Sequence, residues 1–308
     1  MAFTEAQVIE LLAEVFASED SRVLIGIGDD AALVTGSAQQ ILTTDVAVEG
    51  VHFRTDWSSP YEIGKRIAAA NIADVMSMNG ACDYLLVAAT LTGEESLEWI
   101  RDLAVGIADQ AKQAGAVVVG GDLARSKTLS ITITAVGHTD KFIRRSGAQV
   151  GDSIYLSSLT GWSAAGLEIL KRNLNLSGVH AAKALNEYRA PTLDLLTNFS
   201  NATSMADVSD AVLIQGRQMA EASNVGFALD LTLIENAAEY DELHQLAQEM
   251  GAEVLDWILQ GGEDHALLAT GKDLPGIEIG RVHEGSGISL VHNMKEIKMA
   301  PVSWSHFQ

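Results

Sequence analysis

Carboxylate side chains recur along this sequence where apolar runs end or helices are expected to begin. The positions are Asp29-Asp30, Thr43-Thr44-Asp45, Gly120-Gly121-Asp122, Asp207 with Asp210, and Glu263-Asp264. Each has an ordinary explanation when taken singly, because Asp is common in turns and at helix caps. Strand ends are also where open α/β sheets bind ligands, and glycines let a ligand approach the backbone. The repetition favours a ligand site built from carboxylates.

Asp74 gives an independent indication. It follows Ile63, Ile67 and Ala70 at helical spacing, so its carboxylate is expected on or beside the packed face of a helix. A surface position slightly off that stripe is the plain alternative. An inward, unpaired carboxylate would cost much free energy, so an inward Asp74 requires a cation. Oxygen ligands select hard cations, and Mg²⁺ is favoured when phosphates share the coordination.

The charge balance limits the partners. The 308 residues include 41 acidic and 20 basic side chains, giving a formal charge of −21. Such a field repels nucleic acids and anionic membranes, so neither is expected as a partner. It also repels a bare nucleotide. Phosphate chemistry in this chain would therefore need cations.

The compartment is expected to be the cytoplasm. Cys82 is the only cysteine, which excludes an intramolecular disulfide and fits a reducing environment. Its ordinary role is that of a small buried hydrophobe rather than a nucleophile. The first residues lack the basic region of a signal peptide, and no apolar run reaches the roughly 18 residues of a membrane helix.

Two nucleotide-binding motifs are excluded. The segment GIGDDA matches the dinucleotide pattern GxGxxA, but a new strand expected by Ile41 leaves little room for the crossover helix. Two aspartates would also face the pyrophosphate. A Walker-A loop occurs nowhere in the sequence. A phosphate site must be built in another way.

The segment order predicts an α/β (α+β mixed) fold in two domains, because 308 residues exceed the roughly 250–300 residues of one core. A helix capped by Thr4 opens the chain, and a second begins at Ser59-Pro60 with Glu62 completing a capping box. Further helices are expected over residues 94–114, 164–171, 211–222 and 239–250. Strands are expected over residues 23–27, 41–44, 85–91, 116–119, 130–137, 154–157, 226–231, 266–270, 277–282 and 288–291. The polar turn RSGAQVGD places the boundary between domains of residues 1–145 and 146–308.

Eight segments together resemble the thiamine-monophosphate kinase family, within the superfamily of aminoimidazole ribonucleotide synthetase and selenophosphate synthetase. They are GIGDDAALV, TTDVAVEGVHF, AANIADVMSMNGA, GGDLARS, RSGAQVGD, DVSDAV, GGEDHALL and SWSHF, in family order from residue 25 to residue 307. The segments EGVHF and GGED and the C-terminal tryptophan favour this family over its superfamily relatives.

The resemblance implies phosphorylation of thiamine monophosphate to thiamine diphosphate by ATP, with several Mg²⁺ ions and a homodimer. It implies metal ligands at Asp30, Thr43, Thr44, Asp45, Asp74, Asp122, Asp207 and Asp210. It implies ATP contacts from Gly121, Asp122, Arg145 and Ser209, and substrate contacts from His52, Glu263 and Trp304. The family's N-terminal domain binds metal and ATP and pairs its sheet with that of its dimer mate, and the C-terminal α/β domain closes over nucleotide and substrate.

Three segments depart from the family pattern. DVSDAV stands for the usual DLSDGL, GGEDHAL for GGEDYEL, and GGDLARS for GGDTTR, so that Ala211, His265 and Ala266 replace the usual residues while the acidic residues stay. Ala211 could alter the backbone at the start of the expected helix. His265 and Ala266 could alter the packing beside the substrate.

The resemblance also leaves ordinary alternatives open. His52 could be a structural histidine, Arg145 an exposed interdomain arginine, and Trp304 an anchor of the tail. Trp304 could also stack on the pyrimidine of thiamine, and Glu263 could balance the thiazolium charge.

Two other functions remain open beside the kinase. One is another ATP-using synthetase of the superfamily, although residues 1–30 lack the reactive cysteine of the selenophosphate branch. The other is an inactive scaffold that binds divalent cations, which would predict a broken acidic set. For the kinase we expect direct in-line transfer with no acid–base residue, because a phosphate monoester with a second pKa of about 6 is largely ionised already.

Overall fold

The computed structural model describes residues 4–27, 31–37 and 39–297. The chain divides into two compact units. The first comprises Met1–Met76 and Gly80–Asp140, and the second comprises Ser77–Asn79 and Lys141–Gln308. The domain boundary between residues 145 and 146, with metal and ATP binding assigned to the first domain, remains a prediction.

The first unit is built on a four-stranded mixed sheet with strand order β3-β6-β4-β5. Its strands are β3 (Gln40–Val48), β4 (Ala81–Leu91), β5 (Val117–Arg125) and β6 (Ser130–His138). Its helices are α1 (Glu5–Val15), α2 (Pro60–Ser77) and α3 (Leu97–Gln113), and a short hairpin pairs β1 (Val23–Ile25) with β2 (Leu33–Val34). β4, α3 and β5 form a βαβ unit, because β4 and β5 run parallel.

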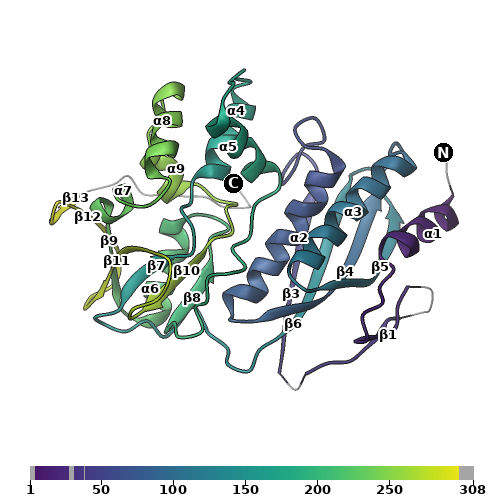
Figure 1. The fold of residues 1–308 in the computed structure, drawn as a ribbon, viewed down its shortest axis with the longest axis horizontal. Coiled ribbons are helices and arrows are strands. Elements are labelled where there is room, and N and C mark those ends of the chain that lie inside the picture. Colours follow the sequence, from purple (N-terminus) through teal and green to yellow (C-terminus); the bar gives the residue numbers. More distant parts are fainter. Residues whose placement is uncertain (1–3, 28–30, 38, 298–308) are drawn as a thin grey trace. The chain divides into compact units, whose positions relative to one another are not determined.

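One face of this sheet is packed and the other is open. On β6, Ile131 and Ile133 are fully buried, whereas Thr132 and Thr134, which alternate with them, are half-exposed. Figure 1 shows α2 and α3 lying over one face of the sheet. The two helices approach closely at glycines, since a Cβ on Gly64 would lie 2.2 Å from the Leu103 carbonyl oxygen. The alternation of the strand sequence therefore creates one core-facing and one solvent-facing surface.

The second unit holds a seven-stranded sheet with strand order β13-β12-β9-β11-β7-β10-β8. The strands are β7 (Ser153–Leu156), β8 (Ser204–Asp207), β9 (Gly226–Asp230), β10 (Leu267–Gly271), β11 (Ile277–His283), β12 (Gly287–His292) and β13 (Lys295–Ile297). The helices are α4 (Trp162–Lys171), α5 (Val179–Arg189), α6 (Val212–Ser223), α7 (Leu231–Glu235), α8 (Tyr240–Met250) and α9 (Val254–Gln260). The central strands are buried on both faces, and one core contains Leu156, Phe227 and Leu268 together with side chains from the helices. Short near-continuous apolar strands are what a sheet covered on both faces requires.

The structure confirms the mixed α/β class and corrects several boundaries. The first helix is capped by Thr4 with Gln7, as expected, and Ser59 and Glu62 exchange hydrogen bonds at the start of α2. The elements β2, β8, β13, α5, α7 and α9 were not expected. The helix expected from residue 94 begins at Leu97 instead, because the Glu95 carboxylate accepts the backbone N–H groups of Thr92 and Gly93 and holds them in a turn.

The sequence suggested that Asp45 and Asp122 lie at the ends of their strands. In the structure both lie inside their strands. β3 continues from Asp45 to Val48, because Val46 and Val48 suit an extended strand. β5 runs through Gly120 and Gly121 to Arg125. No helix within the described residues is both long enough and apolar enough to cross a membrane.

Candidate active site

Strand β3 and helix α2 bring three of the expected site residues together. The Thr43 hydroxyl donates a hydrogen bond to Asp74 Oδ2 at 2.6 Å. Two residues further along the strand, the Asp45 backbone N–H donates to Asn71 Oδ1 at 3.1 Å. Thr43 and Asp45 therefore face α2, and Asp74 points toward the strand rather than away from it. This is the inward orientation that the helical spacing predicted.

Thr44 lies on the other face of the strand. Its hydroxyl is 3.1 Å from the Ile133 carbonyl oxygen and 3.0 Å from the Thr134 hydroxyl on the neighbouring strand β6. Successive side chains of a strand point to opposite faces, so Thr44 cannot share the Thr43–Asp74 contact through its side chain.

Asn71 is a site residue that the sequence reasoning did not single out. Its side chain is completely buried, its Oδ1 accepts the Asp45 N–H, and its Nδ2 donates to the Ile67 carbonyl oxygen at 3.0 Å. The amide thus fixes the backbone of β3 against α2 next to Asp45. A polar residue on the buried stripe, one turn before Asp74, was the available signal.

Asp122 is exposed within β5 and lies apart from this group. The sheet register aligns it with Ala88, Thr132 and Val46. Asp45 is aligned, through the neighbouring strands, with Gly121, the residue before Asp122. Residues aligned across neighbouring strands share a face, so Asp122 lies on the face opposite Asp45. Gly121 cannot be replaced without a shift, since a Cβ there would lie 1.8 Å from the Val87 carbonyl oxygen.

In the second unit, the DVSD and GGED segments are in direct contact. The Glu263 N–H donates to the Ser209 carbonyl oxygen at 2.7 Å. A Cβ on Gly262 would lie 2.4 Å and 2.5 Å from the carbonyl oxygens of Ser209 and Asp210. Gly262 is therefore needed for the two segments to meet. The structure brings together Ser209, Asp210 and Glu263, whose roles as ATP contact, metal ligand and substrate contact remain predictions.

Gln215 organises the same group and was missed by the sequence reasoning. It is buried in α6, and its Oε1 accepts the Ala211 N–H at 2.9 Å. Its Nε2 lies 3.3 Å from both Ser209 Oγ and Asp210 Oδ2. The glutamine thus satisfies a backbone donor at the start of the helix and positions two predicted ligands.

Asp207 and His265 form a buried pair behind this group. Asp207 ends β8, and its Oδ2 is 3.5 Å from Nδ1 of His265, whose Nε2 lies 3.8 Å from a Glu263 oxygen. Burial by itself lowers the pKa of His265, but the neighbouring carboxylates of Asp207 and Glu263 outweigh it and raise the pKa to about 10. His265 therefore lies between one predicted metal ligand and one predicted substrate contact, and both carboxylates favour its protonated form.

Two further predicted site residues, His52 and Arg145, each have a hydrogen-bond partner in the structure. His52 is half-buried, and its Nδ1 accepts the Val48 N–H at 3.1 Å, so its Nε2 carries the proton in the neutral ring. Arg145 is exposed and donates to Gln218 Oε1 at 3.2 Å. Asp30 and Trp304 lie outside the described residues. Within the described ranges, no three or more His, Cys, Asp or Glu side chains are clustered closely enough to hold a metal ion.

The sequence is similar to proteins named thiamine-monophosphate kinase. It is 34% identical to thiamine-monophosphate kinase of Mycobacterium tuberculosis (strain CDC 1551 / Oshkosh) over 254 residues, which is 82% of this chain and 76% of the relative. The chain belongs to the thiamine-monophosphate kinase family. It is also 30% identical to the family member from Aquifex aeolicus (strain VF5), over 91% of this chain and 92% of that protein.

The fold agrees with this family. A family model described as AIR synthase related protein, N-terminal domain, matches residues 28–139. A solved structure described as AaThiL complexed with AMPPCP and TMP superposes with a TM-score of 0.79 at 28% sequence identity, covering 98% of this chain and 97% of that chain. The two-domain mixed α/β fold and the kinase class are therefore those of this family.

One departure from the family pattern, at Ala211, has a structural explanation. Ala211 precedes α6 with φ −179°, an extended conformation that any residue adopts, so no glycine is needed there. Glu263 and His265 both have positive φ, 65° and 52°, which strains non-glycine residues. The contacts of Glu263 with Ser209 and of His265 with Asp207 hold the GGED segment in this strained conformation.

Proposed function

We propose that this chain transfers the γ-phosphoryl group of ATP to thiamine monophosphate, giving thiamine diphosphate and ADP, in the cytoplasm. Family membership over most of the chain is the observation that carries the substrate assignment. The relative solved with AMPPCP and TMP supports the same pair of ligands for this chain.

Magnesium is the metal that the donor set fits. Asp45, Asp74 and the Thr43 hydroxyl offer hard oxygen donors on β3 and α2, and Asp207 and Asp210 offer two more carboxylates in the second unit. Asp30, Thr44 and Asp122 are proposed as ligands by motif position alone, and the side chains of Thr44 and Asp122 lie on the sheet face opposite Asp45, so they would hold a different ion. Bound magnesium ions supply positive charge that offsets the repulsion between two phosphate groups and stabilises charge during transfer.

The side chains of this protein then act by positioning rather than by proton transfer. The acceptor phosphate is largely ionised at neutral pH, so no general base is required and direct in-line transfer without a phosphoenzyme is expected. Gly121, Asp122, Arg145 and Ser209 are proposed to contact ATP, and His52, Glu263 and Trp304 to contact thiamine monophosphate. Asn71 and Gln215 hold the predicted ligands Asp45 and Asp210 in place.

A homodimer is the proposed assembly. Large apolar side chains stand on the open face of the first unit's sheet, namely Leu42 (67% exposed), Val46 (53%) and Leu86 (38%). Threonines 44, 132 and 134 lie among them by register. An apolar sheet face of this kind suits the same face of a second copy.

The test is ADP release in the presence of different acceptors. With ATP and Mg²⁺, we expect ADP to form rapidly with thiamine monophosphate and at background rate without an acceptor. A similar rate of ADP formation with and without thiamine monophosphate would favour another ATP-using synthetase of the superfamily. No ADP under any condition would favour an inactive scaffold that binds divalent cations.

A further inference from the structure

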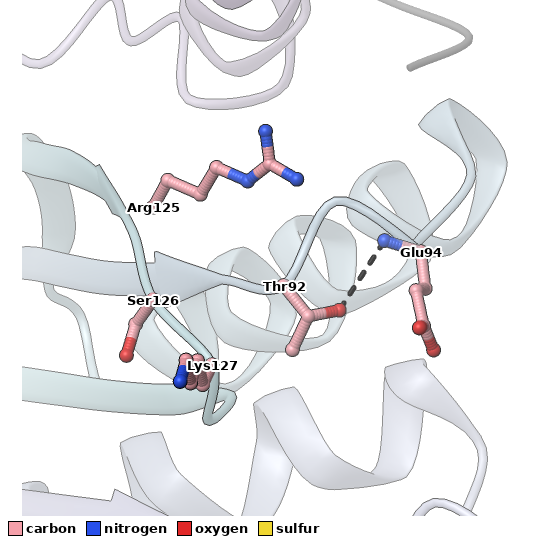
Figure 2. Close-up of a pocket in the computed structure, with 5 residues that line it drawn as sticks. All are labelled: Thr92, Glu94, Arg125, Ser126 and Lys127. Carbon is pink, nitrogen blue, oxygen red and sulfur yellow. Dashed lines mark hydrogen bonds between the residues drawn. The ribbon is translucent and has the colours of Figure 1, made fainter.

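A concavity of about 490 Å³ opens at the carboxyl ends of β4 and β5, lined by Thr92, Glu94, Arg125, Ser126 and Lys127 (Figure 2). These two strands are parallel and are joined by α3. Ligands often bind at the carboxyl ends of parallel strands in such a βαβ unit, where the loops that follow the strands meet. Arg125 and Ser126 end the GGDLARS segment that holds the predicted ATP contacts Gly121 and Asp122, and Lys127 follows it directly.

The concavity carries positive charge in an acidic protein. Arg125 and Lys127 are both exposed, and neither has an ion pair with any residue that the structure describes. Arg125 passes over Gly93, where a Cβ would be 3.6 Å from Nη2, and Gly93 has φ +90°. The turn therefore presents bare backbone to the guanidinium, and Figure 2 shows the side chain extending above Thr92 toward the Glu94 loop.

The hydroxyl groups differ in what they can still offer. Thr92 Oγ1 donates to Glu95 Oε1 at 2.8 Å and accepts the Glu94 N–H at 3.2 Å, so its proton already has an acceptor within the turn. Ser126 Oγ accepts the Thr128 N–H at 3.3 Å, and its own proton has no acceptor among the described residues. The site thus presents a guanidinium, an ammonium and a hydroxyl donor. Such a donor set matches the oxygens of a phosphate group.

This donor set is separate from the predicted ATP contact on the same strand. Arg125 is aligned with Leu91, and Asp122 with Ala88, so the two side chains leave β5 on opposite faces. The charges of Arg125 and Lys127 are therefore not explained as counterions of Asp122.

We propose that Arg125, Lys127 and Ser126 form a second binding site of this protein, specific for the phosphate group of a small molecule. Glu94 at its rim weakens binding by repulsion and limits the charge of the ligand that fits. Phosphate binding at this site requires neither nucleotide nor metal, so it is independent of the kinase reaction.

The experiment measures binding of inorganic phosphate and of glycerol 3-phosphate by isothermal titration calorimetry, at low ionic strength with EDTA and without ATP. In the absence of metal the acidic residues elsewhere repel both probes, and loss of saturable binding in the double variant assigns that binding to the basic site. Replacing both cations, Arg125→Gln with Lys127→Gln, is expected to raise the Kd at least about tenfold, since each removes a charge-assisted hydrogen bond. Glu94→Gln is expected to lower the Kd about twofold to threefold, because it removes a repelling charge.

Lys112→Gln is the matched control, since Lys112 is an exposed lysine in the last turn of the same helix α3. It should leave the Kd unchanged. Tighter binding of glycerol 3-phosphate than of inorganic phosphate would identify a phosphate ester as the ligand, and tighter binding of inorganic phosphate would identify free phosphate. The proposal is overturned if the wild-type protein shows no saturable binding, or if the double variant and the Lys112 variant bind alike.

Discussion

Asp45 and Asp74 reach the same side of the β3–α2 pair from different elements, and each is expected to be indispensable for phosphoryl transfer. Asp45→Asn or Asp74→Asn keeps the side-chain size but removes one negative charge, and an asparagine at position 74 can still accept the hydrogen bond from Thr43. The loss of a hard ligand is expected to lower kcat/KM at least about a hundredfold, which is roughly 3 kcal/mol of transition-state stabilisation. Circular dichroism and the midpoint of thermal unfolding should stay close to those of the wild type.

The control for these variants is Asp102→Asn, because Asp102 is exposed on α3 and takes part in none of the site contacts. It should retain wild-type activity. Full activity in both Asp45→Asn and Asp74→Asn would refute their assignment as metal ligands.

Cys82 is expected to be inert in the folded protein. Burial raises the pKa of its thiol to about 12, with the nearby Asp83 charge adding to the effect. The raised pKa keeps the neutral thiol dominant through pH 8, and the thiolate is the species that reacts. A thiol reagent at pH 8 should therefore modify Cys82 at least about a hundredfold more slowly in the native than in the denatured protein. Equal rates would show that the side chain is accessible and ionised.

Some of these residues were predictable from sequence and others were not. The inward orientation of Asp74 followed from the helical spacing of apolar residues before it. The roles of Asn71 and Gln215 did not, because a buried polar side chain is interpretable only when its hydrogen-bond partner is known. In both cases that partner is placed by the fold: Asp45 on another element, and Ser209 and Asp210 in the loop before α6.

At the scale of elements, helix α4 depends on a carboxylate far away in the sequence. Asp264 accepts the backbone N–H groups of Gly161 and Ser163 at 2.9 Å and 3.0 Å, at the N-terminus of a helix whose own first residues supply no side-chain cap. A carboxylate in that position satisfies otherwise unpaired donors and interacts favourably with the helix dipole. Asp264→Ala is expected to lower the free energy of unfolding by about 1–2 kcal/mol, measured by urea denaturation.

The matched change is Asp256→Ala, at an exposed position in α9 whose carboxylate accepts only from Gln260 among the described contacts. It should cost less than about 0.5 kcal/mol. Equal losses in the two variants would show that Asp264 has no special part in holding α4.

Strand ends were the least predictable elements. The sequence suggested that Asp45 and Asp122 follow their strands, because aspartate and paired glycines usually mark turns. Hydrogen bonding to β6 and β4 overrides that preference, and both strands continue for three residues beyond the aspartate. The carboxylates are therefore held by a rigid sheet rather than by loops.

At the scale of the whole molecule, the open sheet face predicts the assembly state. Leu42→Lys combined with Val46→Lys places two charges on an edge strand among exposed apolar residues. Light scattering coupled to size-exclusion chromatography should give twice the mass of the chain for the wild type and the mass of one chain for the variant. A wild-type protein that elutes as a monomer, or a variant that stays dimeric, would contradict the proposed interface.

The kinase activity itself is tested most directly by following the transferred group. The protein is incubated with Mg²⁺, thiamine monophosphate and ATP labelled with ³²P in the γ position, and the products are separated by chromatography. Direct transfer predicts that one labelled thiamine diphosphate forms for each ADP, that EDTA abolishes both, and that no label stays on the protein. Label released as inorganic phosphate, or ADP formed without labelled thiamine diphosphate, would contradict the proposed function.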